Sequence, residues 1–360
     1  MKTRSLLAVL LVLGCLPAVA QLATPERLEQ LRQLFPGADT NKDGTLTEPE
    51  ARAFYTKMRP AAPAAPSVAP APTFADVHYG PHERNVLDFW QAKSDQPTPL
   101  VVYIHGGGFV SGDKSGVRKD RTVEQYLAAG VSFAAINYRY RTTTPIQDVL
   151  HDCARAIQFL RSKSAEWKID KTRVAAYGGS AGAGTSLWLA FHDDMADANN
   201  SDPVLRESTR LTCAGSIAGQ FSYDVLRWPE ILGEDAAKKF SEGSEAYSFY
   251  GLKSDEEVRG PIGQKVRGDC DMLGLISKDD PAVWVSASMR GGEITDRNQY
   301  LHHPKHSQVI CDRCRELGVP FVADIPALGL KPAKDGPLNL RAFFLQQLKV
   351  DASPTSTGAN

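Results

Sequence analysis

The sequence predicts an α/β fold in which helices flank a mostly parallel sheet, with a small helical module at the N-terminus. Three observations support this prediction. Short apolar runs typical of strands alternate with helical patterns along most of the chain. Two glycine-rich turns, His105–Phe109 and Gly178–Gly182, each follow a strand-like run. An acidic loop, Asp39–Glu50, lies between two helical patterns near the N-terminus.

Residues 1–20 have the pattern of a secretory signal peptide. Lys2 and Arg4 form a basic start, the run Leu6–Leu13 is apolar, and small residues follow it. We therefore expect an exported protein, periplasmic or secreted. The alternative is a lipoprotein signal that ends at Cys15 and anchors the protein. No later apolar segment is long enough to cross a membrane.

Residues 21–59 are predicted to form a single EF-hand module. Helical patterns, Pro25–Leu34 and Pro49–Met58, flank a loop that matches D-x-[DN]-x-[DN]-G-x5-E without a gap. Calcium prefers several hard oxygen ligands on a tightly curved loop, and Gly44 permits the sharp turn. Ca²⁺ is therefore the expected cofactor. The expected metal ligands are Asp39, Asn41, Asp43, Thr45 and Glu50.

EF-hands usually occur in pairs, and no second loop of this kind is visible in the sequence. This module is therefore expected to pair with another copy, to pack on the larger domain, or to bind calcium weakly. A polar turn between two helices, without a metal, is the simpler alternative.

The Ala/Pro tract 60–72 predicts a semi-rigid linker. Residues 73–350 are predicted to form one large domain, and 351–360 a polar tail. Within the large domain, 222–278 shows no strand pattern and is expected to be a lid or insertion. The predicted strands are Asp76–Tyr79, Val86–Trp90, Leu100–Ile104, Val131–Tyr138, Val174–Tyr177, Leu211–Ile217, Ala282–Ser288 and Phe321–Ile325.

The turn Gly178–Gly182 is a Gly-x-Ser-x-Gly motif, typical of a nucleophilic serine on a sharp strand-to-helix turn. Small neighbours are needed because the backbone there is strained and crowded. The earlier glycine-rich turn is typical of an oxyanion hole. Ser180 is therefore the candidate nucleophile, and the backbone N–H groups of Gly107, Gly108 and Ala181 are the candidate oxyanion donors.

The region from Phe74 to Val350 resembles the hormone-sensitive-lipase-like and feruloyl/acetyl-xylan-esterase-like branch of the α/β hydrolases. The resemblance is carried by Leu87–Trp90, His105–Phe109, Asn137–Tyr140 and Gly178–Gly182. It implies an α/β-hydrolase fold and hydrolysis of acyl or acetyl esters, carbohydrate esters included. It also implies a Ser–acid–His triad and no cofactor for the hydrolase chemistry.

By that resemblance, the acid follows the next-to-last strand, where Glu293 or Asp296 fits. The histidine is expected after the last strand, but no histidine follows His306. A recruited base, most plausibly His303 or His302, is therefore expected to serve Ser180.

Three functions remain open from the sequence. A serine esterase is favoured by the two glycine-rich turns. A non-catalytic ligand-binding protein on the same scaffold is suggested by the missing histidine. A calcium-dependent structural protein depends on the EF-hand alone. The formal net charge of −1 gives no indication of nucleic-acid binding. Five cysteines follow the predicted signal, and packing thiols or a local disulfide are favoured over a zinc site at Cys311 and Cys314.

Overall fold

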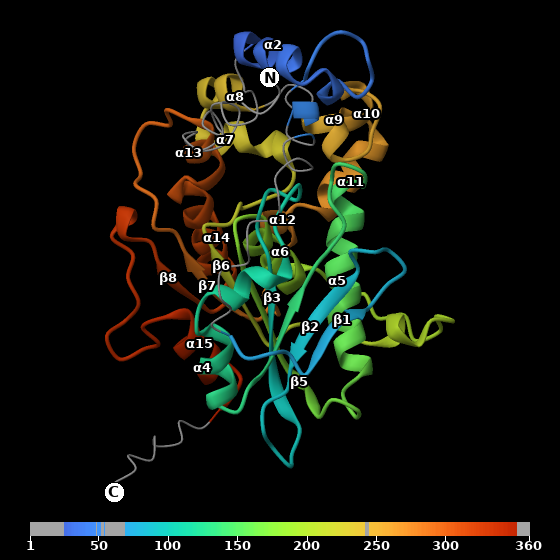
Figure 1. Cartoon of the computed structure of the whole chain (residues 1–360). Helices are drawn as coiled ribbons and strands as arrows, with labels where there is room; N and C mark the ends of the chain where they lie inside the picture. The colour runs from blue at the N-terminus through green and yellow to red at the C-terminus, as the bar shows by residue number, and fades with distance from the viewer. Residues whose placement is uncertain (1–24, 48, 52–53, 55–68, 242–244, 351–360) are drawn as a thin grey trace, which may run out of the picture. The chain divides into compact units, whose positions relative to one another are not determined.

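The computed structural model describes residues 25–47, 49–51, 54, 69–241 and 245–350 (Figure 1). The chain divides into two compact units, 1–66 and 67–360. The predicted signal peptide 1–20 and tail 351–360, with most of the predicted linker, lie outside the described residues. None of the helices in the described ranges is long and apolar enough to cross a membrane.

The first unit has a small apolar centre. Helix α2 (Pro25–Leu34) is followed by the 3₁₀ turn η2 (Pro36–Ala38), and residues 49–51 and 54 are helical. The rings of Phe35 and Phe54 lie 5.6 Å apart. Ala38, Leu46 and Ala51 are buried with them. This packing holds the two ends of the loop 39–50 together.

The second unit is built on one eight-stranded sheet with the order β1-β2-β4-β3-β5-β6-β7-β8. The strands β1 and β2 pair antiparallel, as do β2 and β4, and all other neighbours are parallel. All eight predicted strands are present, so the predicted fold class is confirmed. The strands are β1 (Phe74–His78), β2 (Val86–Trp90), β3 (Thr98–Ile104), β4 (Ser132–Ile136), β5 (Ile169–Gly179), β6 (Cys213–Ile217), β7 (Ala282–Ser286) and β8 (Phe321–Asp324).

Helices cover both faces of this sheet (Figure 1). Apolar side chains of α5 (Ile146–Ser162), α6 (Ala181–Phe191) and α14 (Pro304–Leu317) belong to the core on one face. Those of α4 (Thr122–Ala128) and α15 (Leu340–Gln347) belong to the core on the other face. Central strands such as β3 are apolar almost throughout because both of their faces are covered.

Most strand ends differ from the prediction by one or two residues, and two boundaries differ by more. The domain was expected to begin at residue 73, but Ala69 is already buried in its core, and the indole N–H of Trp90 donates to the carbonyl of Pro70 at 2.7 Å. The end of the predicted linker therefore packs on the sheet unit. Strand β5 begins at Ile169, ahead of the predicted Val174, because Ile169 pairs with Thr98 of β3. All five described cysteines are buried free thiols, so of the two alternatives for Cys311 and Cys314 the structure has packing thiols.

The expected insertion 222–278 contains short helices and no strand in its described part. It connects β6 to β7, and its aromatic residues belong to the same core as α5, α6 and α14. Its helices are α7 (Trp228–Leu232), α8 (Glu234–Phe240), α9 (Glu245–Phe249), α10 (Asp255–Arg259), α11 (Pro261–Asp269) and α12 (Met272–Leu275).

Candidate active site

Ser180 lies on a sharp turn between β5 and α6. Its backbone has φ 53° and ψ −118°, a conformation that residues other than glycine rarely adopt. A Cβ atom on Gly178 would lie 2.3 Å from the carbonyl oxygen of Ile104, and one on Gly182 would lie 2.0 Å from it. Only glycine therefore fits two positions before and two positions after the serine, which explains the Gly-x-Ser-x-Gly motif in physical terms.

The imidazole of His302 meets this serine. The Nε2 atom of His302 lies 2.8 Å from the Oγ atom of Ser180, within hydrogen-bond distance. His302 is the last residue of α13 (Arg297–His302), which follows β7. The parallel strands bring the end of β7 and the end of β5 to the same edge of the sheet. The histidine at the serine thus comes from the segment after β7, whereas the segment after β8 contains no histidine.

The partner of the other imidazole nitrogen is Asn298. The Nδ1 atom of His302 lies 3.0 Å from Oδ1 of Asn298 and 3.1 Å from its backbone oxygen. Glu293 and Asp296, the expected acids, are not brought to this position. Asp296 instead caps α13, because its Oδ1 accepts the N–H of Gln299 at 2.8 Å. Sequence reasoning missed Asn298 because it searched that segment for carboxylates only.

The second expected base, His303, has a different role. Its Nδ1 accepts the N–H of Lys305 at 3.1 Å and so caps α14, and its Nε2 donates to the carbonyl of Gly292 at 3.2 Å. Both ring nitrogens are therefore occupied. His306 is also engaged at both nitrogens, by the N–H of Phe221 and the carbonyl of Tyr300. Of the three neighbouring histidines, only His302 is brought to Ser180.

Burial sets the protonation of His302. The pKa of His302 is lowered from its ordinary value because its partly buried position disfavours the imidazolium, and the carbonyl of Asn298 opposes this only in part. Burial also lowers the pKa of His306 to about 4. Both imidazoles are therefore neutral at neutral pH, and His302 has a lone pair available to accept a proton.

The expected oxyanion donors surround the serine turn. Gly106 packs so closely on it that a Cβ there would lie 2.6 Å from the carbonyl of Gly179. Gly107 has φ 106°, and its carbonyl turns away to accept the N–H groups of Val110 and Ser111. In the described part of the chain, the N–H groups of Gly107, Gly108 and Ala181 donate to no protein acceptor. They remain available to a substrate oxygen.

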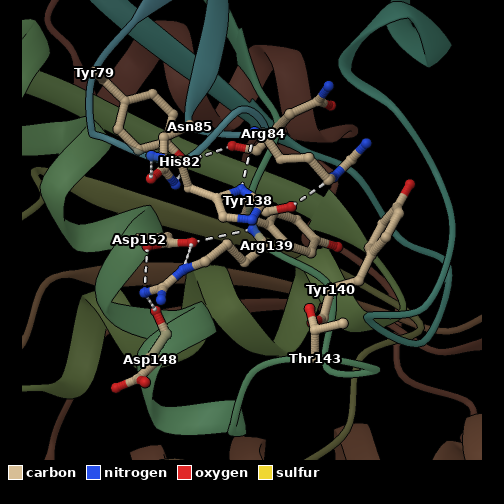
Figure 2. Close-up of polar contacts among 11 residues, drawn as sticks. Tyr79, His82, Arg84, Asn85, Tyr138, Arg139, Tyr140, Thr143, Asp148 and Asp152 are labelled. Atoms are coloured by element: carbon tan, nitrogen blue, oxygen red, sulfur yellow. Dashed lines mark hydrogen bonds and ion pairs between the residues drawn. The ribbon is translucent and has the colours of Figure 1, made fainter.

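A polar network supports the glycine-rich turn. The hydroxyl of Tyr138 donates to the carbonyl of His105 at 2.7 Å, and the hydroxyl of Tyr140 donates to that of Gly112 at 2.6 Å. Arg84 donates to the carbonyl of Tyr138, and its guanidinium lies 3.8 Å from the centre of the Tyr140 ring. Figure 2 shows Arg84 beside both tyrosines. The network fixes both ends of the oxyanion turn.

The segment that begins at Gln220, including the insertion, supports the helix that carries His302. The side-chain amide of Gln220 donates to the carbonyl of Leu301 at 2.8 Å. The ring of Trp228 lies 5.4 Å from that of Tyr300 and 4.9 Å from that of His306. Tyr223 donates to the carbonyl of Ala181 at 2.7 Å. These aromatic residues therefore hold the site together in addition to packing among themselves.

The N-terminal loop has part of the geometry that calcium needs. Oδ1 of Asp39 is buried without a hydrogen-bond partner, while Oδ2 accepts the N–H of Gly44 at 2.9 Å. Gly44 has φ 85°. The carboxylate of Glu50, however, accepts hydrogen bonds from Thr40 and Thr47. No group of three or more His, Cys, Asp or Glu side chains is arranged as a metal site in the described ranges. The carboxylate oxygens of this loop are thus engaged in hydrogen bonds within the loop, apart from Oδ1 of Asp39.

Comparisons with known proteins place this geometry in context. Residues 87–223 match the BD-FAE family model. The chain is 32% identical over 236 residues to the "Probable carboxylic ester hydrolase LipM" of Mycobacterium tuberculosis, over 58% of this chain and 53% of that protein. It is 29% identical over 122 residues to the "Probable isoprenylcysteine alpha-carbonyl methylesterase ICMEL2" of Arabidopsis thaliana, over 34% and 28%. The chain thus spans about half or less of the length of these relatives.

Two solved structures share the architecture. A truncated carbohydrate esterase from gut microbiota superposes with a TM-score of 0.56 at 14% identity, over 77% of this chain and 96% of that one. A bifunctional GH43-CE protein of Bacteroides eggerthii also gives 0.56, at 17% identity, over 76% of this chain and 38% of that one. These likenesses show the fold. Together with the sheet order and the serine turn, they establish that the protein has the α/β-hydrolase fold.

Proposed function

We propose that this protein is a serine-dependent carboxylic ester hydrolase. The observation that carries the proposal is the 2.8 Å contact between Oγ of Ser180 and Nε2 of His302. The available N–H groups of Gly107, Gly108 and Ala181 support it, because acyl transfer needs donors where the oxyanion develops. The BD-FAE match over 87–223 includes both Ser180 and the oxyanion turn. The name of the Mycobacterium tuberculosis relative supports the same reaction class.

In the proposed mechanism, Ser180 attacks the ester carbonyl while Nε2 of His302 accepts the hydroxyl proton. The carbonyl oxygen becomes the oxyanion and rests on the three N–H groups. As the ester C–O bond breaks, His302 returns the proton to the leaving alkoxide, and an acyl-serine remains. Water then attacks the acyl-serine with His302 again as base, which releases the acid and restores the serine. No step needs a metal or an organic cofactor.

The proposed substrates are acyl or acetyl esters, with acetylated carbohydrate as the second class to test. The motive for a non-catalytic role was the lack of a histidine after the last strand. In the proposal, His302 on the connection between β7 and β8 supplies the base. The lack of a later histidine therefore no longer favours a purely binding protein. We therefore retain the esterase as the single proposed function of the large domain.

Replacement of Ser180 by alanine tests this function. We expect kcat/KM for p-nitrophenyl acetate to fall by about 10³-fold or more, because the nucleophile is removed while the oxyanion donors remain. Ser94→Ala is the matched control, since Ser94 is an exposed serine in the loop after β2. Hydrolysis of both p-nitrophenyl acetate and acetylated xylan at the wild-type rate by Ser180→Ala would refute the proposal.

We also propose that the N-terminal loop binds calcium in an exported protein. The oxygen donor set and the unpartnered Oδ1 of Asp39 support binding. Hydrogen bonds from Thr47 are the main reason why the pKa of Glu50 is lowered to about 2, so this ligand is ionised at neutral pH. Weak binding would suffice outside the cytoplasm, where millimolar sites function. Export itself is proposed from residues 1–20 alone.

Isothermal titration calorimetry with calcium checks this second proposal. We expect a single site with a Kd of about 10⁻⁴ to 10⁻³ M, in the range of extracellular EF-hand modules. The Glu50→Gln variant should lose this binding, because it replaces the bidentate carboxylate by a neutral amide. Titration of wild type with magnesium is the control for nonspecific ion effects. No heat of binding from wild type at millimolar calcium would contradict a calcium site.

A further inference from the structure

We infer that the base of this site is held by an uncharged pair of oxygens, both from Asn298, in place of the carboxylate that usually orients such a histidine. The inference deepens the proposed ester hydrolysis and rests on it. Asn298 is on this view a positioning residue, because it acts on the substrate only through His302. The side chain of Asn298 and its own backbone carbonyl both reach Nδ1 of His302.

The backbone carbonyl fixes the tautomer. A carbonyl oxygen only accepts hydrogen bonds, so the 3.1 Å contact requires the proton to be on Nδ1. The amide oxygen of Asn298, 3.0 Å away, then accepts from the same N–H. The lone pair of the neutral ring is consequently at Nε2, which faces Ser180. The ring is ready to accept the serine proton without any acidic partner.

The helix geometry explains how one residue supplies both oxygens. Asn298 lies four residues before His302 on α13, so its carbonyl points along the helix toward the last turn. The imidazole folds back over that turn, and the Asn298 side chain on the same face closes the contact. Because Asp296 is committed to the cap of this helix, its carboxylate is used elsewhere.

The pKa of His302 is set by burial and one hydrogen bond, with no charged group among the causes. Burial lowers its pKa, and only the hydrogen bond with the Asn298 carbonyl raises it. The neighbouring imidazoles of His303 and His306 are neutral for the same reason of burial. Charged side chains also occur on the four neighbouring segments. They are Arg290, Glu293 and Asp296 before α13, Arg297 on α13, Lys305, Asp312, Arg313, Arg315 and Glu316 on α14, and Glu234, Asp235, Lys238 and Lys239 on α8.

An uncharged orienter has a functional consequence. During catalysis the imidazole becomes an imidazolium, and two neutral oxygens stabilise that charge less than a carboxylate would. The lowered pKa of His302 also means that protonation inactivates the base only at a pH below the ordinary histidine pKa of about 6.5. Activity should therefore be retained down to that pH, and be lost as the pH falls through the lowered pKa of His302.

The decisive experiment is the pH profile of kcat/KM for p-nitrophenyl acetate in wild type and Asn298→Asp. Aspartate has nearly the same shape and adds a negative charge beside Nδ1. We expect the acid limb to move up by about one pH unit, because a carboxylate favours the imidazolium. Above that limb, kcat/KM should rise by up to about tenfold, the factor that corresponds to one pKa unit.

Two further variants separate position from charge. Asn298→Ala keeps the backbone carbonyl, so kcat/KM should fall by less than about tenfold and the acid limb should stay in place. Gln308→Glu makes the same amide-to-carboxylate change on α14, outside the contacts of His302, and should leave the limb unchanged.

The outcomes distinguish this inference from the proposed function. An unmoved acid limb in Asn298→Asp, together with an inactive Ser180→Ala, would overturn the uncharged pair and leave the esterase proposal standing. A limb that moves down in Glu293→Gln would also overturn it, because a carboxylate would then act on the base. Full activity in Ser180→Ala would overturn both.

Discussion

Replacement of His302 by alanine is expected to lower kcat/KM for p-nitrophenyl acetate by about 10³- to 10⁴-fold. The serine hydroxyl is a weak nucleophile at its ordinary pKa, and Nε2 of His302 is the only imidazole nitrogen in contact with it within the described part of the chain. The oxyanion donors remain, so a residual rate above that of water is expected. Steady-state kinetics at pH 8, where His302 of the wild type is neutral, gives the cleanest comparison.

His303→Ala is the matched control for this experiment. The neighbouring imidazole caps α14 through Nδ1 and donates to Gly292 through Nε2, so it has no nitrogen to offer the serine. Loss of the cap should cost about 1 kcal/mol of stability with kcat little changed. Equal losses of kcat in the two variants would contradict the assignment of the base to His302.

The Asp88→Asn substitution is expected to lower the free energy of unfolding by about 3 kcal/mol, because it removes the one buried carboxylate of an ion cluster. The buried ammonium of Lys114 then keeps only its exposed partner, Asp76, at 2.7 Å. Asp88 lies in β2 with its side chain fully buried. Its Oδ1 lies 2.6 Å from the ammonium of Lys114, which is almost as deeply buried, and its Oδ2 pairs with Arg118. Asparagine keeps the shape and removes only the charge.

Urea unfolding followed by circular dichroism measures this effect. The transition midpoint should fall while the slope stays constant, which indicates a change in stability alone. Glu124→Gln is the control, since its ion pair with Arg121 on α4 is exposed and should contribute nothing measurable. A midpoint for Asp88→Asn equal to that of wild type would show that the cluster contributes nothing net to stability.

The serine turn could be predicted from the sequence because its requirements are local. The close approach of the Ile104 carbonyl excludes a side chain at Gly178 and Gly182, two positions before and after Ser180. The chemistry therefore leaves a pattern in five adjacent residues. The central strands were likewise visible as apolar runs, since buried parallel strands carry apolar side chains on both faces. Strand ends were less exact, because pairing with a neighbour, as at Ile169, extends a strand beyond its apolar run.

The base and its partner could not be fixed in this way. His302 lies 122 residues from Ser180 in the sequence, and three histidines share one short segment. The sequence pattern left His302 and His303 as alternatives. The structure brings His302 to the serine, because His303 precedes the next helix and is used as its cap. Asn298 was not considered, since an amide gives no sequence signal of acid–base chemistry.

The sequence by itself determined the α/β class, the order of the strands along the chain, the serine turn and the glycine-rich turn, because each depends on residues a few positions apart. Only the tertiary structure decided which histidine reaches Ser180 and which group faces its other nitrogen. The physical reason is that these contacts join residues far apart in the sequence. They depend on where α13 ends, on the contacts of Gln220 and Trp228 with α13, and on the common edge of the sheet at which β5 and β7 end.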